Sequence, residues 1–538
     1  MTRRLWYQQG TRVDARFHHR LVPVRPVQTV VHPGASARSV GAHPAPPAAG
    51  GLSVERRAAG GALWVLLAFA VSRLLGFASN LVLARLLSPT EFGLVSFAMI
   101  AIGAFTLLQD LGTPAAIVYG RRDVREVGGT ALTINLAAAL ALFLVLGLAA
   151  PELAALGGDA AIGPIVTALA LGLVVSAIGS VQSAALVKEL ALRRKFLPDV
   201  VPLIASGVLS IALALAGFGV WSLVVGYLAK AVVATLMLWA LSPLRPWPRF
   251  HRVIAGELLG YGQHMSFSAV LGFATMNADY FVVGHFLGAA ELGLYTMAFQ
   301  IATMPCKAIG ELATKVVFPA YTRLGDDREA LARFLIRIMR LTGMVAVPVG
   351  VAIAVPAPGY VSLLLSERWS GMVAALQVLA VFGVLQAIGY NFPAAYKALG
   401  RPKALWKFNL LKLALVVPPW LAVVAGGIAA ISAVHVVAEA AVLPLYAFVL
   451  ARYLGIPIGR LWQALRPPLA GGLAAGAVVA LAYTAPSLAA VVREPLGSFG
   501  LTAAALAAYA VVLVALDREA RALLRAGIGA PQRQVNRI

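Results

Sequence analysis

The 538-residue chain has a single cysteine and few charged residues. Cys306 can form no disulfide within the chain and no cysteine-rich metal site. Only 12% of the residues are charged, whereas about 25% is typical of soluble domains, and 60% are hydrophobic. This mixture cannot build a water-facing surface, but it can build a lipid-facing one. We therefore expect an integral membrane protein.

The sequence also lacks the short motifs of common enzyme classes. It contains no match to the G-x-x-x-x-G-K-[ST], H-E-x-x-H or G-x-S-x-G patterns, so no ATPase, zinc protease or hydrolase is indicated. The net charge of +22 would suggest nucleic-acid binding in a soluble protein. Because the positive residues here lie in short loops between apolar runs, we interpret the charge as membrane topology. We expect no nucleic-acid partner, no catalytic residue, no metal site and no cofactor.

Apolar runs of membrane-spanning length recur along the chain. A transmembrane helix needs about 20 residues. Fourteen runs lie at about 61–84, 92–118, 129–150, 162–186, 200–216, 219–241, 262–285, 292–320, 341–365, 371–396, 406–424, 428–450, 467–485 and 498–516. The break at Gly426-Gly427 predicts that the eleventh and twelfth runs form a helical hairpin. The predicted fold class is an all-α polytopic membrane protein with about fourteen transmembrane helices.

The loops between these runs differ in charge. Alternate loops and the C-terminal tail hold 27 Lys and Arg residues, whereas the other loops hold three, namely Arg85, Arg368 and Arg493. Cytoplasmic loops carry the excess of positive charge, so we expect both termini to be cytoplasmic. The longest loops on the other side, 151–161 and 486–497, have about a dozen residues each. They are too short for the external catalytic loop that a membrane glycan polymerase usually needs.

Two segments 200 residues apart are similar and indicate an internal repeat. The recurring residues are Leu87, Glu91, Gly93 and Leu94, which correspond to Leu287, Glu291, Gly293 and Leu294. Both copies begin a helix on the same side of the membrane, so the repeats run in parallel. Parallel six-helix repeats related by a pseudo-two-fold axis are a transporter architecture. We expect two six-helix lobes and two extra helices.

The chain then divides into six parts. The first 57 residues are rich in Pro, Ala, Gly, Arg and His and contain no signal-peptide pattern. The predicted parts are a basic disordered cytoplasmic tail (1–58), an N-terminal six-helix lobe (59–241), a cytoplasmic linker (242–261), a C-terminal six-helix lobe (262–452), two additional helices (453–516) and a basic cytoplasmic tail (517–538).

Few ionisable residues fall inside the predicted spans. Each costs roughly 2.5–3.5 kcal/mol at the bilayer centre, so such residues are expected to face a watery cavity or one another. The candidates for a substrate cavity are Arg73, Asp110, Lys230, Lys307, Glu311, Lys315 and Lys412. The candidates for proton or ion coupling are Asp279, His435 and Glu439. Because cations are in excess, we expect an anionic group on the substrate.

Several of the cavity candidates have a purely structural alternative. Lys307, Glu311 and Lys315 are spaced i, i+4 and i+8 on one helix face, so they could neutralise one another as an ion ladder. Lys412 lies close to the cytoplasmic end of its span, so its side chain could extend to the interface.

The coupling candidates have alternatives too. His435 and Glu439 are four residues apart, and they could form either a proton-coupled pair or a buried hydrogen-bonded pair that only holds the helix in place. Asp279 lies near the outer end of its span and is interpreted as a structural or interfacial residue.

Several loose motifs follow one another in a specific order over about residues 60–460. They are Asn277-Ala278-Asp279, Phe286-Leu287-Gly288, Gly293-Leu294-Tyr295, Val317-Phe318-Pro319-Ala320, Ser366-Glu367-Arg368-Trp369 and Ala398-Leu399-Gly400-Arg401-Pro402. In these motifs the chain resembles the polysaccharide-transport family of lipid-linked oligosaccharide flippases. The resemblance is greatest to the lipopolysaccharide and colanic-acid exporter branch. That family belongs to the multidrug/oligosaccharidyl-lipid/polysaccharide exporter superfamily, whose fold is two six-helix lobes with two extra helices in some members.

The resemblance implies a transporter and no enzyme. Such a protein flips a polyprenyl-pyrophosphate-linked oligosaccharide from the cytoplasmic to the outer face of a bacterial cytoplasmic membrane by alternating access. The implied partners are the lipid-linked glycan, the bilayer, and a polysaccharide polymerase with its chain-length machinery. The implied driving force is the membrane potential or coupling to H⁺ or Na⁺.

One motif resembles the first span of the related lipid II flippases. Residues 72–78 carry Arg73 at the position where the motif has an arginine that lines a cationic cavity. The resemblance therefore implies this role for Arg73. Ser79 stands where the motif has a second arginine, so a sugar headgroup other than that of lipid II is favoured.

Two rival functions are weighed against flipping. A cation-coupled multidrug antiporter of the same superfamily favours acidic groups in its cavity and often has twelve spans. A membrane glycosyltransferase or polymerase needs a sizeable outer loop and an acidic metal-binding motif. The excess of intramembrane cations disfavours the antiporter, and the short outer loops disfavour the enzyme.

Overall fold

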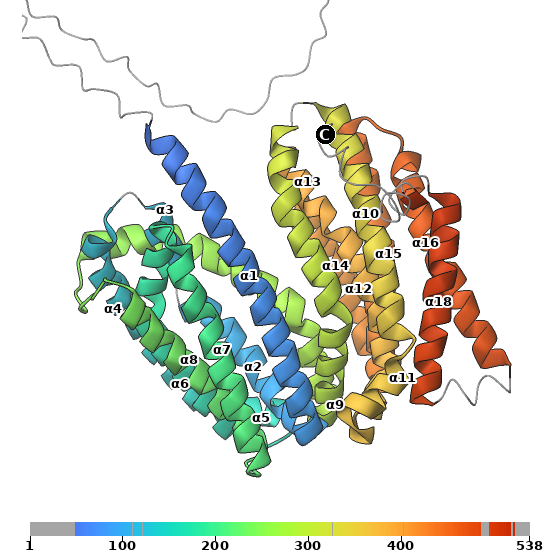
Figure 1. Ribbon diagram of the computed structural model, residues 1–538. Helices are drawn as coiled ribbons and strands as arrows, with labels where there is room; N and C mark the ends of the chain where they lie inside the picture. Colours follow the sequence, from blue (N-terminus) through green and yellow to red (C-terminus); the bar gives the residue numbers. More distant parts are fainter. Residues whose placement is uncertain are drawn as a thin grey trace, which may run out of the picture. The chain divides into compact units, whose positions relative to one another are not determined.

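The computed structural model describes residues 49–109, 111–120, 122–324, 327–401, 403–485, 494–517 and 520–521. These residues are almost entirely helical, and no strand occurs among them (Figure 1). The chain divides into two compact units, residues 1–54 and 55–538. The arrangement described below is that of the second unit.

The helices of the first half are mostly long and apolar. They are α1 (Ala49–Leu86), α2 (Pro89–Gln109), α3 (Thr113–Tyr119), α4 (Val124–Leu148), α5 (Ala150–Gly157), α6 (Ile162–Lys188), α7 (Leu192–Leu215) and α8 (Val220–Leu241). Within this group α4 packs against α6, α6 against α8, and α7 against α8.

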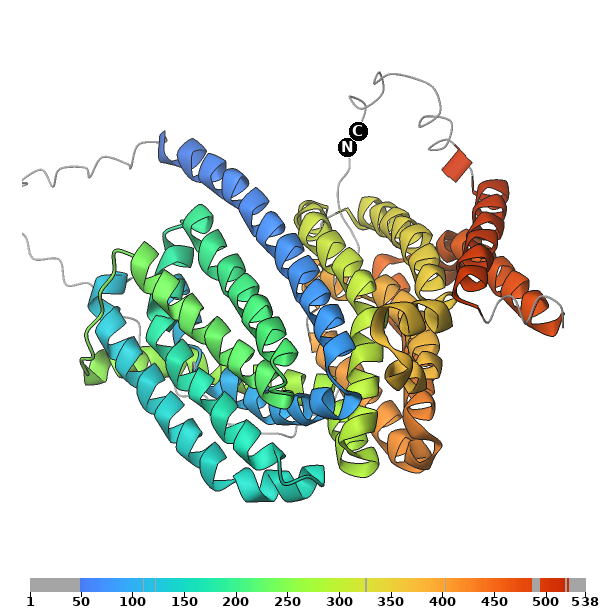
Figure 2. The same ribbon diagram turned by 60° about the horizontal axis from the view of Figure 1, so that its bottom comes forward.

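The second half contains further long helices with short helical pieces between them. They are α9 (Arg252–Arg323), α10 (Arg328–Ala354), α11 (Ala357–Tyr360), η1 (Val361–Leu365), η2 (Glu367–Met372), α12 (Val373–Gly389), α13 (Asn391–Ala398), α14 (Lys403–Val423), η3 (Val424–Gly426), α15 (Gly427–Leu454), α16 (Ile458–Thr484) and α18 (Pro495–Leu516). Here α12 packs against α9, α10 and α15, while α16 packs against α10 and α18. Figure 2 shows α16 and α18, drawn in orange-red and red, side by side at one edge of the bundle.

The long helix α9 folds back on itself. Gly288 has φ 85° and ψ 177°, which is not helical, so it divides α9 into a first arm (252–287) and a second arm (289–323). Tyr295 Oη donates to Asp279 Oδ2 at 2.8 Å although the two residues are 16 positions apart. In a straight helix they would be about 24 Å apart. The two arms are therefore antiparallel.

A second hairpin joins α14 to α15, as predicted from the two glycines. Gly427 has φ 75° and ψ −170°, a conformation that suits glycine. Lys412 of α14 forms an ion pair with Glu439 of α15, 27 positions away. A straight helix would separate them by about 40 Å. The hairpin at Gly426-Gly427 is confirmed.

The number of crossings can be compared with the prediction. Twelve helical stretches of the described residues are long and apolar enough to cross a membrane. Two of them, Met276–Gly310 and Lys407–Leu454, contain the hairpin turns described above. The fourteen crossings stay a prediction, and the described helices fit it if each arm crosses once.

The internal repeat is visible as a reciprocal contact between α2 and the second arm of α9. A methyl group added at Gly93 would lie 1.7 Å from Ala289 O, and one added at Gly293 would lie 1.8 Å from Pro89 O. Gly293 is the equivalent of Gly93, and Ala289 is the equivalent of Pro89, each 200 positions further on. The two contacts are therefore the same contact, made once from each repeat. This is the contact that a pseudo-two-fold axis produces. We call the end of the bundle that contains residues 88–93 and 289–293 the crossing end.

Two predicted boundaries lie inside helices of the structure, and one predicted span is divided into two helices. α1 begins at Ala49, inside the segment predicted as a tail, because Ala, Leu, Glu and Arg favour helix there. α9 begins at Arg252, inside the predicted linker. The second predicted span is broken after α2, since Leu111 and Gly112 both have positive φ, and α3 follows.

Candidate functional site

A cavity of about 600 Å³ lies between α1, α2, α7, α8 and both arms of α9. Hydroxyl and amide side chains line it, among them Ser79, Asn80, Ser96, Asn277, Thr296 and Gln300. The aromatic residues of the lining are Phe92, Tyr227, Phe273 and Tyr280. Asn80 Nδ2 donates to Gln300 Oε1 at 3.1 Å and so links α1 to the second arm of α9. We call this space the central cavity.

Lys230 is the one charged residue among those that line the central cavity. It lies on α8, about eleven residues beyond Gly219 at the start of that helix. A methyl group added at Gly219 would lie 2.6 Å from Glu91 Oε1, so this start is at the crossing end. Lys230 is thus about 16 Å from the crossing end, near the middle of a hydrocarbon core about 30 Å thick.

Thr296 adds a polar group to the wall of the central cavity. Its hydroxyl is buried and has no hydrogen-bond partner among the described residues. A buried hydroxyl without a partner is costly, and a polar ligand in the cavity could satisfy it.

Arg73 lies beside a second, smaller pocket of about 310 Å³ between α1 and α7. Its guanidinium lies 5.2 Å from the centre of the Phe69 ring. Lys195, which forms an ion pair with Asp199 at 2.6 Å, lines the same pocket. Arg73 and Lys230 therefore do not share one pocket. Ser79, where the lipid II flippase motif has its second arginine, does line the central cavity.

Three of the buried polar side chains meet on the other side of α9. Tyr295 Oη donates to Asp279 Oδ2, and His435 Nε2 of α15 lies 3.2 Å from the same oxygen and 3.0 Å from Tyr295 Oη. The exposed fractions are 1% for Asp279, 0% for Tyr295 and 7% for His435. Asp279 is thus a member of a buried cluster, which its predicted place near the outer end of a span did not indicate.

The predicted pairing of His435 with Glu439 is wrong. Glu439 forms an ion pair with Lys412 of α14, and His435 is bonded to Asp279 and Tyr295 instead. The spacing of four residues allows contact along one helix, but partners from α9 and α14 fit the two side chains better. Lys412 is therefore held by Glu439 and is not among the residues that line the central cavity.

The other candidates are placed only in part. Lys307 lies with its Nζ 5.1 Å from the centre of the Phe299 ring, on the second arm of α9. The side chains of Glu311 and Lys315 lie outside the described residues, as does Asp110. The predicted ion ladder on this arm therefore stays a prediction.

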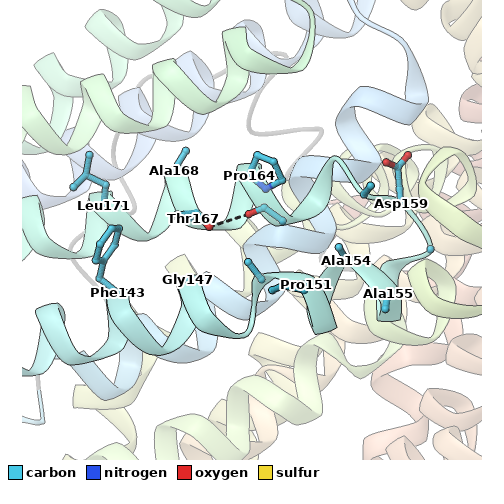
Figure 3. A pocket seen from close by; sticks show the side chains of 14 residues that line it. Phe143, Gly147, Pro151, Ala154, Ala155, Asp159, Pro164, Thr167, Ala168 and Leu171 are labelled. Atoms are coloured by element: carbon cyan, nitrogen blue, oxygen red, sulfur yellow. Dashed lines mark hydrogen bonds between the residues drawn. The ribbon is translucent and has the colours of Figure 1, made fainter.

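A larger groove of about 1040 Å³ lies between α4, α5 and α6 (Figure 3). Small apolar residues make up most of its wall, including Gly147, Ala154 and Ala168. Thr167, also on the wall, uses its hydroxyl to bond Gly163 O. Asp159 at one end is the only charged residue that lines it. This groove has no cation for an anionic substrate.

A cluster of charged side chains ties the start of α9 to the first half of the chain. Arg122 donates from Nε and Nη2 to both carboxylate oxygens of Glu257, each at 2.9 Å, and from Nη1 to Glu126. The hydrogen bond from Arg122 lowers the pKa of the Glu257 carboxyl, and the same contact raises the pKa of the Arg122 guanidinium. The sequence predicted neither this pair nor its place, because the partners are 135 positions apart.

The fold is similar to the folds of two solved membrane transporters. A lipid II flippase, MurJ, in an inward closed conformation matches with a TM-score of 0.66 and 14% identity, covering 86% of this chain and 100% of that one. An inward-facing multidrug transporter of the MATE family, from the MOP superfamily, matches with a TM-score of 0.57 and 19% identity, covering 71% and 95%. At these identities the likeness shows the fold alone.

The family follows from the sequence comparison. The family model described as "Polysaccharide biosynthesis protein" matches residues 82–374, more than half of the chain. The chain belongs to this family and is a multi-pass membrane protein. It is 25% identical to the lipopolysaccharide biosynthesis protein WzxC of Escherichia coli, covering 70% of this chain and 76% of that one. It is 26% identical to the succinoglycan biosynthesis transport protein ExoT of Rhizobium meliloti, covering 63% and 68%.

Proposed function

We propose that the protein is a flippase that carries a lipid-linked oligosaccharide across the membrane by alternating access, for the export of a cell-surface polysaccharide. The central cavity is the observation that carries this proposal. It has several hydroxyl and amide side chains in its lining, it lies inside a bundle of membrane-spanning helices, and it has one cation near mid-depth. Relatives named as polysaccharide biosynthesis and transport proteins support it.

The lining of the central cavity suits a glycan. Hydroxyl and amide groups such as Ser96, Asn277 and Gln300 can exchange hydrogen bonds with sugar hydroxyls, and aromatic rings such as Tyr227 and Tyr280 offer flat apolar faces. The volume of about 600 Å³ falls within the range of sites for small organic ligands. The apolar lipid tail would stay in the bilayer.

The cations suit an anionic linker. Lys230 in the central cavity, and Arg73 in the neighbouring pocket, can offset the cost of holding a pyrophosphate within the membrane. Moving about two negative charges outward down an inside-negative potential of 100 mV releases roughly 4–5 kcal/mol. The potential can therefore drive flipping without ATP.

The proposed orientation has both termini in the cytoplasm of a bacterial cell and the crossing end outside. The 27 Lys and Arg residues in alternate loops and the C-terminal tail, against three in the other loops, support it. A glycan delivered at the crossing end is then available to a polysaccharide polymerase and its chain-length machinery, which we propose as partners.

Reconstituted vesicles test the function. A fluorescent polyprenyl-pyrophosphate-linked oligosaccharide is placed in the bilayer, and its exposure on each face is measured by quenching from outside. The wild-type protein should equilibrate the lipid between leaflets, whereas Arg73→Ala and Lys230→Ala should slow it at equal protein content. If a cationic dye is transported and the lipid is not, the chain is a drug antiporter and the proposal fails.

A further inference from the structure

The two arms of α9 form a wall with different chemistry on its two sides. On one side, Asn277 and Tyr280 of the first arm, with Thr296 of the second, line the central cavity. On the other side, Asp279 and Tyr295 reach His435 of α15. Since successive residues of a helix point about 100° apart, neighbouring positions such as 279 and 280 serve the two sides. The buried cluster and the cavity thus share one wall.

The three side chains of the cluster are groups that bind and release protons. They are a carboxylate, a phenol and an imidazole. The Tyr295 hydroxyl donates to Asp279 Oδ2, and His435 Nε2 lies 3.2 Å from the same oxygen. When Nδ1 and Nε2 both carry a proton, the positive charge of the His435 imidazolium and the negative charge of Asp279 cancel. When the Nε2 proton leaves, one negative charge stays in a site that is almost closed to water. The loss of the proton is therefore coupled to a rearrangement that hydrates or neutralises Asp279.

Among the residues that the structure describes, the groups around the cluster offer Asp279 no other positive charge that would neutralise its carboxylate. Aromatic rings pack around His435, with centroids 4.9 Å away for Phe382, 5.0 Å for Trp420 and 5.7 Å for Phe299. Two lysines of the adjoining helices interact with other groups. Lys412 of α14 is in its ion pair with Glu439, and Lys307 of the second arm lies over the Phe299 ring. Tyr280 faces Tyr295 with its ring, and α12 carries no charged residue.

The donor set favours a proton over a metal ion. Hard cations take six or more oxygen ligands, whereas this cluster offers one carboxylate, one phenol and one ring nitrogen. Among the described residues no group of three His, Cys, Asp or Glu side chains could hold a metal ion.

We propose that Asp279, Tyr295 and His435 form a proton-binding centre that is loaded and emptied once in each transport cycle. In uptake, a proton from water bonds to His435 Nε2, and in release the N–H bond breaks and the proton returns to water on the other face. The inference rests on the proposed function in so far as the central cavity is the substrate site.

Coupling follows from the shared wall. The Tyr295 ring packs against the Tyr280 ring at 5.5 Å, and Tyr280 lines the central cavity. A shift of Tyr295 when the proton leaves therefore moves the cavity wall. By linkage, substrate in the cavity must change the affinity for the proton by the same factor that the proton changes the affinity for substrate.

Histidine spectroscopy tests the centre without any substrate. Carboxylate and imidazole bands of the purified protein are followed by infrared difference spectroscopy during a pH titration. A band that His435→Gln and Asp279→Asn both remove, and that His285→Gln leaves in place, is the expected result. His285 is a matched control because it lies on the same arm of α9 as Asp279 but contacts Leu156 O instead of the centre. Absence of such a band in wild type would overturn the proposal.

Transport tests the coupling. In vesicles with no membrane potential, an imposed pH gradient should change the steady-state distribution of the lipid-linked glycan in the wild-type protein. His435→Gln should lose this effect of the gradient, whereas His285→Gln should respond as the wild-type protein does. A sodium gradient that acts at equal pH, or a pH effect that His435→Gln retains, would refute a proton centre. No flipping by wild type would instead defeat the proposed function and leave the spectroscopic test standing.

Discussion

At the scale of the residue, Lys230 is the charged side chain in the lining of the central cavity. Of the four predicted cavity residues whose side chains the structure describes, it is the one that lines the central cavity, while Arg73 lies beside the next pocket and Lys412 is bonded to Glu439. A lysine at mid-depth of a membrane bundle is costly without an anion or water nearby. The substrate would supply the anion.

Replacing Lys230 should weaken substrate binding. A hydrogen bond to a charged group contributes about 1.5–3 kcal/mol, so Lys230→Gln should bind the lipid-linked glycan roughly 10- to 100-fold more weakly, whereas Lys230→Arg keeps the charge and most of the affinity. Binding can be measured by native mass spectrometry or fluorescence titration. Lys397→Gln, at an exposed position of the largely buried α13, is the control. Equal affinity in Lys230→Gln and wild type would remove Lys230 from the site.

The sequence indicates which residues are unusual but not which residues meet. An ionisable residue inside an apolar run is visible from the sequence, and so Asp279 and His435 of the buried cluster were among the predicted site residues. Their pairing was not predicted, because periodicity relates only residues three or four apart on one helix. His435 is bonded to residues 140 and 156 positions away. Tyr295 was missed as a site residue, since a tyrosine carries no charge to single it out.

At the scale of the element, the repeat and the two hairpins organise the helices. The hairpin at Gly426-Gly427 was predicted from two adjacent glycines, and the repeat from eight residues that turn out to surround the closest approach of α2 to α9. Glycine at both positions lets the backbones touch. These parts of the fold could be predicted because the signal lies within a few neighbouring residues.

Alanine at either glycine of the crossing should force α2 and α9 apart. The added methyl would lie 1.7 Å from Ala289 O in Gly93→Ala and 1.8 Å from Pro89 O in Gly293→Ala. Overpacking of this kind costs about 1–3 kcal/mol, so both variants should unfold at lower temperature in detergent and by similar amounts. Gly476→Ala, with nothing within 4 Å of its added methyl, should behave as wild type. A stable Gly93→Ala would contradict the backbone contact.

The start of α9 should loosen in acid. Arg122 lowers the pKa of the Glu257 carboxyl, so this contact is complete above the ordinary pKa of a glutamate and is lost as pH falls through the lowered value. A spin label at Val253→Cys in a Cys306→Ser background should therefore gain mobility on acidification. With Glu257→Gln added, the label should be mobile at every pH. A label that stays equally immobile in acid would show that apolar packing alone holds this segment.

At the scale of the whole molecule, the central cavity and the Asp279 cluster lie on the two faces of one hairpin, which the arms of α9 form. Composition and loop charge predicted a membrane bundle and an anionic substrate. They could not separate a cavity from a buried cluster, because both draw on residues from helices far apart in sequence. The α4–α6 groove shows that volume alone does not mark the site, since it is larger but has no cation.

The most direct measurement asks whether the glycan passes through the central cavity. In a Cys306→Ser background, Ser96→Cys places one thiol in the central cavity and Ala155→Cys places one in the α4–α6 groove. Each is labelled with a bulky maleimide before flipping is measured in vesicles. We expect the label at residue 96 to stop flipping, with lipid-linked glycan protecting that thiol, and the label at residue 155 to leave flipping unchanged. Unimpaired flipping with residue 96 fully labelled would contradict a path through this cavity.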